Sequence, residues 1–187
     1  MRVAYAAALV MRPGPDRVGC VPDTDSAASA LAAEAAWYAG LPTMFGSAAA
    51  LITDPEGRVL LVKPNYREHW TLPGGILEDG EPPHVGCGRE VAEELGLDVT
   101  PGPLLTIGWT APAGPRPRPI VHFVFDGGVL DGHAPIRVQE DELDGYRFVE
   151  PGDLAGYLPA FLVARVGAAL QGRASGAAVY LPSSGIA

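Results

Sequence analysis

The stretch GILEDGEPPHVGCGREVAEELGL, residues 75–97, decides how the rest of this 187-residue chain is interpreted. It predicts a helix over residues 83–95, because two prolines stand at the start and a glycine follows the end. At 3.6 residues per turn, Glu90, Glu93 and Glu94 fall within roughly 100° of one another around that helix. Three carboxylates there repel one another and lie near the unfavourable end of the helix dipole. Their spacing therefore indicates a binding site for a cation.

Neighbouring residues support such a site. Arg89 stands four residues before Glu93, the spacing of an ion pair along a helix, and Glu81 is placed to reach back to Arg89. Such contacts orient metal ligands. Gly74 lets the backbone approach a ligand closely, and its carbonyl is a candidate further ligand. Because no thiolate or imidazole set accompanies these oxygens, the sequence predicts Mg²⁺, with Mn²⁺ as the alternative.

The stretch resembles the Nudix box, with the glycine, the glutamates, the arginine and the apolar positions all at the family spacing. With residue frequencies of about 5–7% each, a chance match somewhere in the chain is on the order of 10⁻⁷. The preceding Trp70–Gly75 segment, which ends in Pro-Gly-Gly, agrees with the context of that motif. The resemblance covers about residues 45–182.

The resemblance implies an α/β fold, specifically a Nudix-like α/β/α sandwich with a mixed central sheet. It also implies Mg²⁺-dependent hydrolysis, in which water attacks one phosphorus of a diphosphate linkage in a nucleoside diphosphate derivative. The metal ligands it implies are Gly74, Glu90, Glu93 and Glu94, and the catalytic set adds Arg89 to the three glutamates. In this assignment Arg89 and Glu81 organise the ligands.

Outside the box, the acidic run at residues 140–142 precedes a predicted strand. One interpretation is a solvated turn. The other is that Glu142 supplies an extra carboxylate, because many Nudix enzymes use a base or ligand from outside the box. We include Glu142 in the expected catalytic set.

Three arginines are candidates for substrate binding. Arg67 lies in a loop that also contains a lysine, a tyrosine and a histidine, and it either contacts phosphate or base or is simply solvated. Arg116 and Arg118 lie in the proline-rich loop 112–119, which prolines are expected to hold stiff and extended. Pro112 lies fifteen residues after the box, where Nudix relatives with a proline are associated with ADP-ribose cleavage.

Outside the box, strand and helix patterns follow one another without the strict strand–helix–strand order of a parallel sheet. The sequence therefore predicts a mixed sheet. Expected strands cover residues 47–53, 59–63, 70–72, 104–109, 120–125, 145–149 and 178–181, and a second helix covers residues 158–171. Residues 44–187 are therefore expected to form the Nudix hydrolase domain.

Residues 1–43 are expected to form an N-terminal extension. A strand is expected over residues 3–11 and a loop over 12–25, and an alanine-rich helix is expected to begin at Asp25 or Ser26 and end near Ala39. We interpret this helix as a packing or dimerisation element, so a homodimer is an expected arrangement.

Net charge, cysteine content and the length of apolar runs limit the possible partners and locations of the protein. The formal net charge of −9 disfavours binding to a long nucleic acid but not to a small phosphorylated molecule. Two cysteines do not make a disulfide framework, which favours a cytoplasmic location. No apolar run reaches the ~18 residues of a membrane span.

The function expected from the sequence is hydrolysis of a small diphosphate, with ADP-ribose or a nucleotide sugar favoured as substrate. Alternatives are an (oxidised) nucleoside triphosphate pyrophosphohydrolase, an enzyme acting on isoprenyl diphosphates, and a catalytically silent ligand-binding module. The last is disfavoured because a silent relative has no need of an intact carboxylate set.

Overall fold

The computed structural model describes residues 24–131 and 134–182. The chain divides into two compact units, one ending at Pro42 and one beginning at Thr43, and each is described by itself. The first contains helix α1 (Thr24–Ala39), which begins one residue before the expected start. The strand expected at residues 3–11 lies outside the described residues. The assignment of residues 1–43 as a separate extension stays a prediction.

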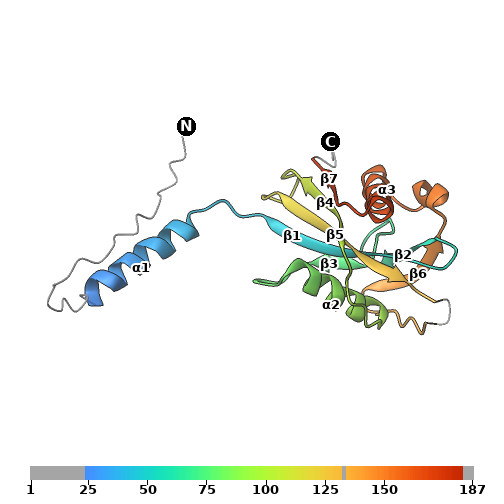
Figure 1. Ribbon diagram of the computed structural model, residues 1–187, viewed down its shortest axis with the longest axis horizontal. Helices are drawn as coiled ribbons and strands as arrows, with labels where there is room; N and C mark the ends of the chain where they lie inside the picture. Colours follow the sequence, from blue (N-terminus) through green and yellow to red (C-terminus); the bar gives the residue numbers. More distant parts are fainter. Residues whose placement is uncertain (1–23, 132–133, 183–187) are drawn as a thin grey trace. The chain divides into compact units, whose positions relative to one another are not determined.

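Within the described residues, the second unit contains one mixed sheet of seven strands (Figure 1). The strands are β1 (Phe45–Thr53), β2 (Val59–Pro64), β3 (Gly74–Ile76), β4 (Leu104–Thr110), β5 (Ile120–Val129), β6 (Leu143–Val149) and β7 (Val179–Leu181). Their order is β6-β2-β1-β5-β4-β7, and β3 pairs with β1. The β1–β5 and β4–β7 pairs are parallel and the other pairs are antiparallel.

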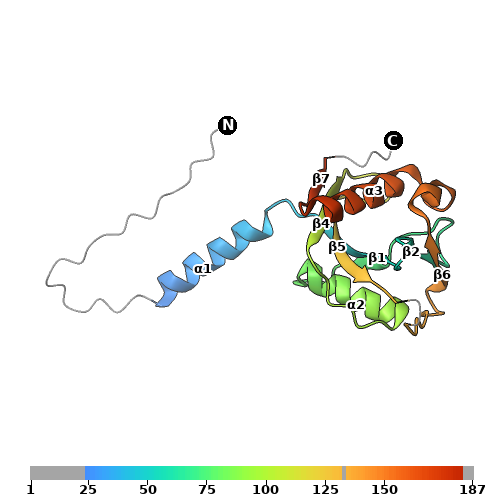
Figure 2. The same cartoon turned by 45° about the vertical axis from the view of Figure 1, so that its right-hand side comes forward.

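Helices cover both faces of this sheet. Figure 2 shows α2 (Pro83–Leu95) on one side and α3 (Ala160–Ser175) on the other. The expected α/β/α sandwich with a mixed central sheet is confirmed. Helix α3 begins and ends later than expected, because a 3₁₀ turn (Pro151–Gly156) and Pro159 precede it and Gly176, in the left-handed conformation, ends it. No helix of the described residues is long and apolar enough to span a membrane.

The strand side chains alternate between two apolar cores. On β2, Leu61 belongs to the core under α3, whereas Leu60 and Val62 belong to the core under α2. On β1, Leu51 and Ile52 divide in the same way. All five side chains are fully buried. Because successive strand residues point to opposite faces, only continuous apolar runs serve a sheet that is covered on both sides.

Strands β1 and β2 separate soon after the turn that joins them, and residues 71–76 fill the gap. The two strands pair only at Thr53 and Val59. Beyond that, Val62 and Thr71 exchange backbone hydrogen bonds of 2.9 and 3.0 Å, and β3 pairs with the first half of β1. The strand expected at residues 70–72 is therefore wrong in position. Only a single bridge forms there, and the strand itself begins at Gly74.

Two glycines of α3 are expected to respond in opposite directions to replacement by alanine. A Cβ at Gly172 would lie 2.5 Å from the carbonyl oxygen of Leu105, whereas a Cβ at Gly167 meets nothing within 4 Å. Gly172→Ala is expected to lower the free energy of unfolding by roughly 1–3 kcal/mol through overpacking. Gly167→Ala is expected to raise it by roughly 0.5–1 kcal/mol, since alanine is the better helix former. Urea unfolding measures both, and a change of the same sign would contradict the packing of α3 on β4.

Candidate active site

Helix α2 holds the box residues in place by packing one side against the sheet. Cys87, Val91 and Leu95 are fully buried in the core beneath it. Gly96, with φ of 64°, ends the helix and donates its N–H to the carbonyl of Ala92. The buried apolar stripe fixes the rotation of the helix about its axis, and so determines where the carboxylates of the other positions lie.

Arg89 joins three of the box carboxylates. Its Nε and Nη2 donate to the two oxygens of Glu81 at 2.9 and 3.0 Å. Its Nη1 donates to Glu93 Oε2 at 2.9 Å and to Glu90 Oε1 at 3.1 Å. The side chain thus makes the contacts expected from its spacing to Glu93 and Glu81. A guanidinium held in a two-point contact has little freedom, so it restrains the carboxylates it touches.

Glu81 is anionic in this arrangement. The hydrogen bonds from Arg89, and then the one from the backbone N–H of Glu78, lower the pKa of Glu81 from 4.5 to about 2. The pKa of Arg89 is raised by the same contact. This pair therefore stays charged across the physiological pH range, as a group that orients its neighbours must.

Glu94 is the most buried of the box carboxylates, with 6% of its surface exposed. Its Oε2 accepts a 2.8 Å hydrogen bond from the backbone N–H of Gly74. Burial, opposed by that bond and reinforced by the charges of Glu90 and Glu142, raises the pKa of Glu94 to about 8. The approach requires a glycine, because Gly74 has φ of 141° and a Cβ there would clash with the backbone of Ala48 and Ala49.

Glu142 lies close enough for its charge to act on the box. It raises the pKa of Glu94, and it contributes to the raised pKa of Glu90, which is due first to burial. The loop before Glu142 is tied to the end of α2, since the N–H groups of Arg137 and Gln139 donate to the carbonyls of Leu95 and Glu94 at 2.8 and 3.0 Å. These bonds satisfy helix-end carbonyls and place the outside carboxylate at the box.

The carboxylate cluster, formed by Glu90, Glu93, Glu94 and Glu142, suits a hard divalent cation by its chemistry. Its members are oxygen donors. Burial first, and then the neighbouring carboxylate charges, raise the pKa values of Glu90 and Glu94, so a bound cation would offset both costs of ionising them. No group of three acidic, histidine or cysteine side chains in residues 24–131 and 134–182 already converges on one point. Glu93 is half-exposed and turned toward Arg89. Binding of an ion would therefore require these side chains to move closer together, because the coordination site is not preformed.

A pocket of about 360 Å³ opens beside this cluster. Glu94 and Gly74 line one part of it, although α2 packs on the opposite face of the sheet from α3. The gap between β1 and β2 makes this possible, because there the bare backbone of Gly74 separates the two faces. Phe161 and Leu162 of α3 form another wall.

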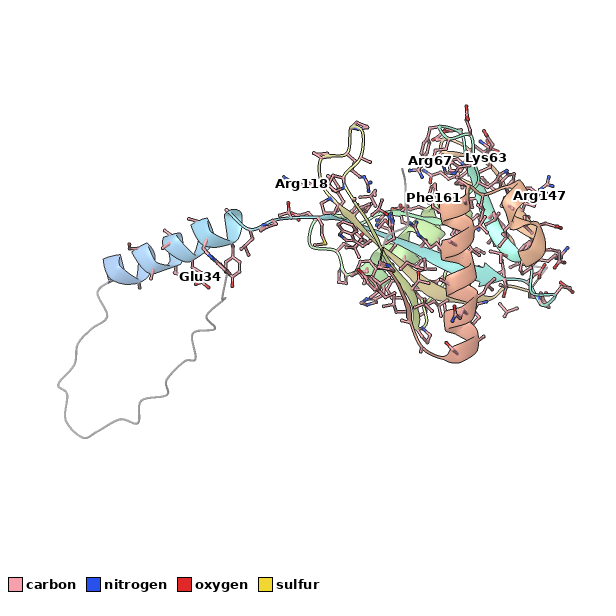
Figure 3. The ribbon with its side chains drawn as sticks, turned by 90° about the horizontal axis from the view of Figure 1, so that it is seen from above. Glu34, Lys63, Arg67, Arg118, Arg147 and Phe161 are labelled. Carbon is pink, nitrogen blue, oxygen red and sulfur yellow. The ribbon has the colours of Figure 1, made fainter. Side chains whose placement is uncertain are left out.

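Two of the three predicted substrate-binding arginines line the pocket. These are Arg67 and Arg116, whereas Arg118 is exposed and does not line it. Figure 3 shows Arg67 near Phe161 and Arg118 apart from both, on the loop between β4 and β5. That loop is not extended as expected. Ala113 and Arg116 exchange backbone hydrogen bonds of 3.2 and 3.0 Å, so the chain reverses there and turns Arg116 inward.

His122 also lines the pocket, although no sequence pattern marks it as a site residue. Its Nδ1 is 2.7 Å from Ser47 Oγ and its Nε2 is 3.2 Å from Thr110 Oγ1. Burial, then the charges of Arg165 and Arg116, lower the pKa of His122 from 6.5 to about 3. The imidazole is therefore neutral at physiological pH. Only the parallel register of β1 and β5, which sets His122 opposite Ser47, brings these residues together.

Cys87 does not take part in the site. It is fully buried, and burial followed by the charge of Glu90 raises the pKa of its thiol to about 12. Cys87 therefore serves as a small buried side chain of the core beneath α2.

Comparison with known proteins identifies similarity over most of the second unit. The NUDIX domain matches residues 44–167. An 8-oxo-dGTP diphosphatase from Proteus vulgaris is 40% identical over 62 residues, which are 31% of this chain and 55% of that protein. An ADP-ribose pyrophosphatase from Mycobacterium tuberculosis (strain ATCC 25618 / H37Rv) is 38% identical over 73 residues, which are 36% of this chain and 35% of that protein.

The matched segments are short relative to those proteins, since the chain spans between a quarter and about half of the length of the curated relatives it matches. Among solved structures, the MutT protein from Methanosarcina mazei Go1 superposes with a TM-score of 0.57 at 25% identity. That match covers 72% of this chain and 96% of the other.

The neutral state of His122 predicts a specific loss of stability in acid. Its pKa in the folded state, about 3, lies below its ordinary value of 6.5, so the unfolded chain takes up this proton first as the pH falls. The folded state is therefore penalised progressively below pH 6.5 and increasingly toward pH 3. His122→Gln keeps a donor and an acceptor but does not titrate.

Between pH 7 and 4.5 the wild type is expected to lose about 2–3 kcal/mol more free energy of unfolding than His122→Gln. Urea unfolding at a series of pH values measures the difference. Parallel pH profiles for the two proteins would show that the imidazole is not held neutral.

Proposed function

This chain belongs to the NUDIX family, and on that basis we propose that it hydrolyses a diphosphate linkage in a small nucleoside diphosphate derivative. The proposed reaction joins the oxygen of water to one phosphorus and breaks a bridging P–O bond. Two phosphate-bearing products leave, and the proton passes to a carboxylate of the protein. ADP-ribose and nucleotide sugars rank ahead of oxidised nucleoside triphosphates as substrates.

The observation that carries the proposal is the position of Glu94. This one side chain belongs to the carboxylate cluster and also lines the pocket. Part of a substrate bound in the pocket would therefore lie beside the carboxylates. A pocket with perturbed titratable groups on its wall is the usual setting of catalysis.

Mg²⁺ is the proposed cofactor, with Mn²⁺ as alternative, and the residues proposed to hold it are Glu90, Glu93, Glu94 and the carbonyl of Gly74. When bound, the metal would supply charge neutralisation for the diphosphate and would lower the pKa of a water molecule. Arg89 and Glu81 would keep the ligands oriented through the contacts described above.

Glu142 is proposed as the group that accepts the proton. It is exposed, so it can pass a proton to solvent, and its charge already acts on Glu90 and Glu94. Its backbone position is fixed, because its carbonyl accepts a 2.9 Å hydrogen bond from the N–H of Asn65. A base must lie within hydrogen-bond reach of the water it deprotonates, and an anchored loop beside the cluster meets that need.

Two features support the ranking of substrates. The pocket volume is near the lower end of the roughly 300–1,000 Å³ typical of small-molecule sites. Arg116 lies at the pocket, in the loop that begins with Pro112. The relatives are named for both substrate classes, so they do not decide between them. Arg67 and Arg116 are the proposed substrate-binding residues that the pocket retains.

A substrate panel tests the proposed function. With Mg²⁺, kcat/KM for ADP-ribose or for a nucleotide sugar is expected to exceed that for 8-oxo-dGTP and for unmodified nucleoside triphosphates. The reason is that the two pocket arginines can reach groups beyond the diphosphate. Phosphate released by a coupled phosphatase measures every rate, and the reaction is repeated with chelator in place of Mg²⁺.

Loss of activity in chelator with recovery on adding Mg²⁺ is the required control, and full activity in chelator would remove the metal from the mechanism. If 8-oxo-dGTP exceeds all the other substrates by about tenfold, 1.4 kcal/mol in transition-state stabilisation, the substrate ranking is wrong although the hydrolase assignment stands.

Glu142 and Glu140 form a matched pair of variants, since both are glutamates of the same acidic run and only Glu142 acts on the box charges. Glu142→Gln is expected to lower kcat by about 10²-fold or more, the range for loss of a general base. Glu140→Gln is expected to change kcat by less than about threefold, within the effect of one exposed charge.

Steady-state kinetics on the best substrate of the panel measures both variants, with Glu94→Gln as the reference for a lost box carboxylate. If Glu142→Gln retains wild-type kcat, another carboxylate takes the proton, and Glu90 becomes the candidate.

A further inference from the structure

Arg165 is a buried cation without a counter-ion. It lies on α3, 9% of its surface is exposed, and its Nε has no hydrogen-bond partner. No carboxylate among residues 24–131 and 134–182 lies within ion-pair distance of it. Burial lowers the pKa of Arg165 only to about 10, so the side chain is charged at physiological pH. A buried unpaired charge costs stability, so the fold alone does not account for Arg165.

Arg165 belongs to the wall of the pocket. Arg165 lines the pocket, and its Nε lies 3.8 Å from the Cβ position of Gly108 on β4, beside the ring of His122. Arg116 lines the same region, and both arginines lower the pKa of His122. The imidazole therefore adds no positive charge and leaves two guanidiniums as the charged groups at this end of the pocket.

The two ends of the pocket carry opposite charge and lie far apart. Glu94 is held at Gly74 on β3, and Arg165 lies over Gly108 on β4. Strands β3, β1, β5 and β4 are neighbours in that order, so three strand spacings of about 4.8 Å, roughly 14 Å in all, separate these two positions. A diphosphate engaged by the carboxylate cluster does not extend that far.

We propose that Arg165, assisted by Arg116, forms a subsite for a terminal oxyanion of the substrate, a phosphate monoester or a carboxylate distant from the diphosphate. The inference rests on the proposed function and, within its substrate class, places nucleotide sugars and other derivatives that carry a second acidic group ahead of ADP-ribose, which has none. The fork of guanidinium donors matches the planar or tetrahedral oxygens of such a group.

Burial favours an oxyanion over a neutral acceptor. Arg165 is 9% exposed and has no carboxylate partner among the described residues. An anion bound beside it would balance its charge, whereas a neutral carbonyl would leave that charge uncompensated. Ser47 and Thr110 hydroxyls lie within hydrogen-bond distance of His122 at the same end, so the surrounding wall is polar without being acidic.

The first test measures binding without turnover. Inorganic phosphate and acetate, compared with chloride at equal ionic strength, are expected to raise the Tm of the wild type. The Tm of Arg165→Gln is not expected to respond. Arg137→Gln is the control, because it removes the same charge from an exposed site outside the pocket. Without anion, Arg165→Gln is expected to be at least as stable as the wild type, since no ion pair is lost.

The second test compares substrates that differ only in a terminal acidic group. UDP-glucuronate against UDP-glucose tests a carboxylate, and NADPH against NADH tests a phosphate monoester. For one pair, wild-type kcat/KM is expected to favour the acidic member by about ten- to a hundredfold, the value of a charge-assisted hydrogen bond. Arg165→Gln is expected to abolish that preference, because kcat/KM falls further for the acidic member than for the neutral one. Arg165→Lys keeps the charge but not the paired N–H donors of the guanidinium, so it is expected to retain part of the preference for the acidic member.

The outcomes separate this subsite from the proposed function. An anion-dependent Tm that requires Arg165, in a protein that hydrolyses neither ADP-ribose nor any of the four compounds, would keep the subsite and remove the support for the function. Hydrolysis without preference in either pair, or a phosphate response that survives in Arg165→Gln, would overturn the subsite. Equal loss of rate on both members of a pair would assign Arg165 to the diphosphate itself and would also overturn it.

Discussion

The hydrogen bond from the backbone N–H of Gly74 to Glu94 is the contact on which the rest of the site depends. It connects the helix that carries the acidic residues to the gap in the sheet where β1 and β2 separate. Only a glycine fits between Glu94 and β1, because a Cβ would meet the backbone of Ala48 and Ala49. Through this opening a side chain from one face of the sheet reaches a pocket walled by the helix on the other face.

The distribution of charge follows from that geometry. Burial at the gap makes a full set of ionised carboxylates costly, which is why the pKa of Glu94 rises to about 8 and that of Glu90 also rises. Arg89 balances part of the charge, and its firm contact with Glu81 keeps it in place. The cluster therefore has the oxygen donors that a hard cation requires, whereas Arg165 and Arg116 contribute positive charge to another part of the pocket wall. The four strands β3, β1, β5 and β4 lie between these two positions. A single substrate that contacts both would therefore have to extend well beyond its diphosphate.

Much of the fold and part of the site were predictable from local patterns. Helix α2 has the expected bounds because its prolines and Gly96 act on the nearest backbone only. The Arg89 contacts followed from positions four and eight residues apart. The sequence predicted a short strand at residues 70–72, whereas the strand β3 lies at Gly74–Ile76. Its position depends on which residues of β1 leave room for a neighbouring backbone and not on its own side chains.

The sequence by itself determined the family, the helix and its carboxylates, because each depends on spacing within about twenty residues. Only the tertiary structure decided which distant groups share the pocket. Ser47 meets His122 across 75 residues through the register of a parallel strand pair, and Arg165 reaches them from a helix on top of the sheet. Such encounters are set by the order and register of strands, which the packing of the whole domain selects. The position of a single histidine or arginine in the sequence therefore does not predict which distant residues it contacts.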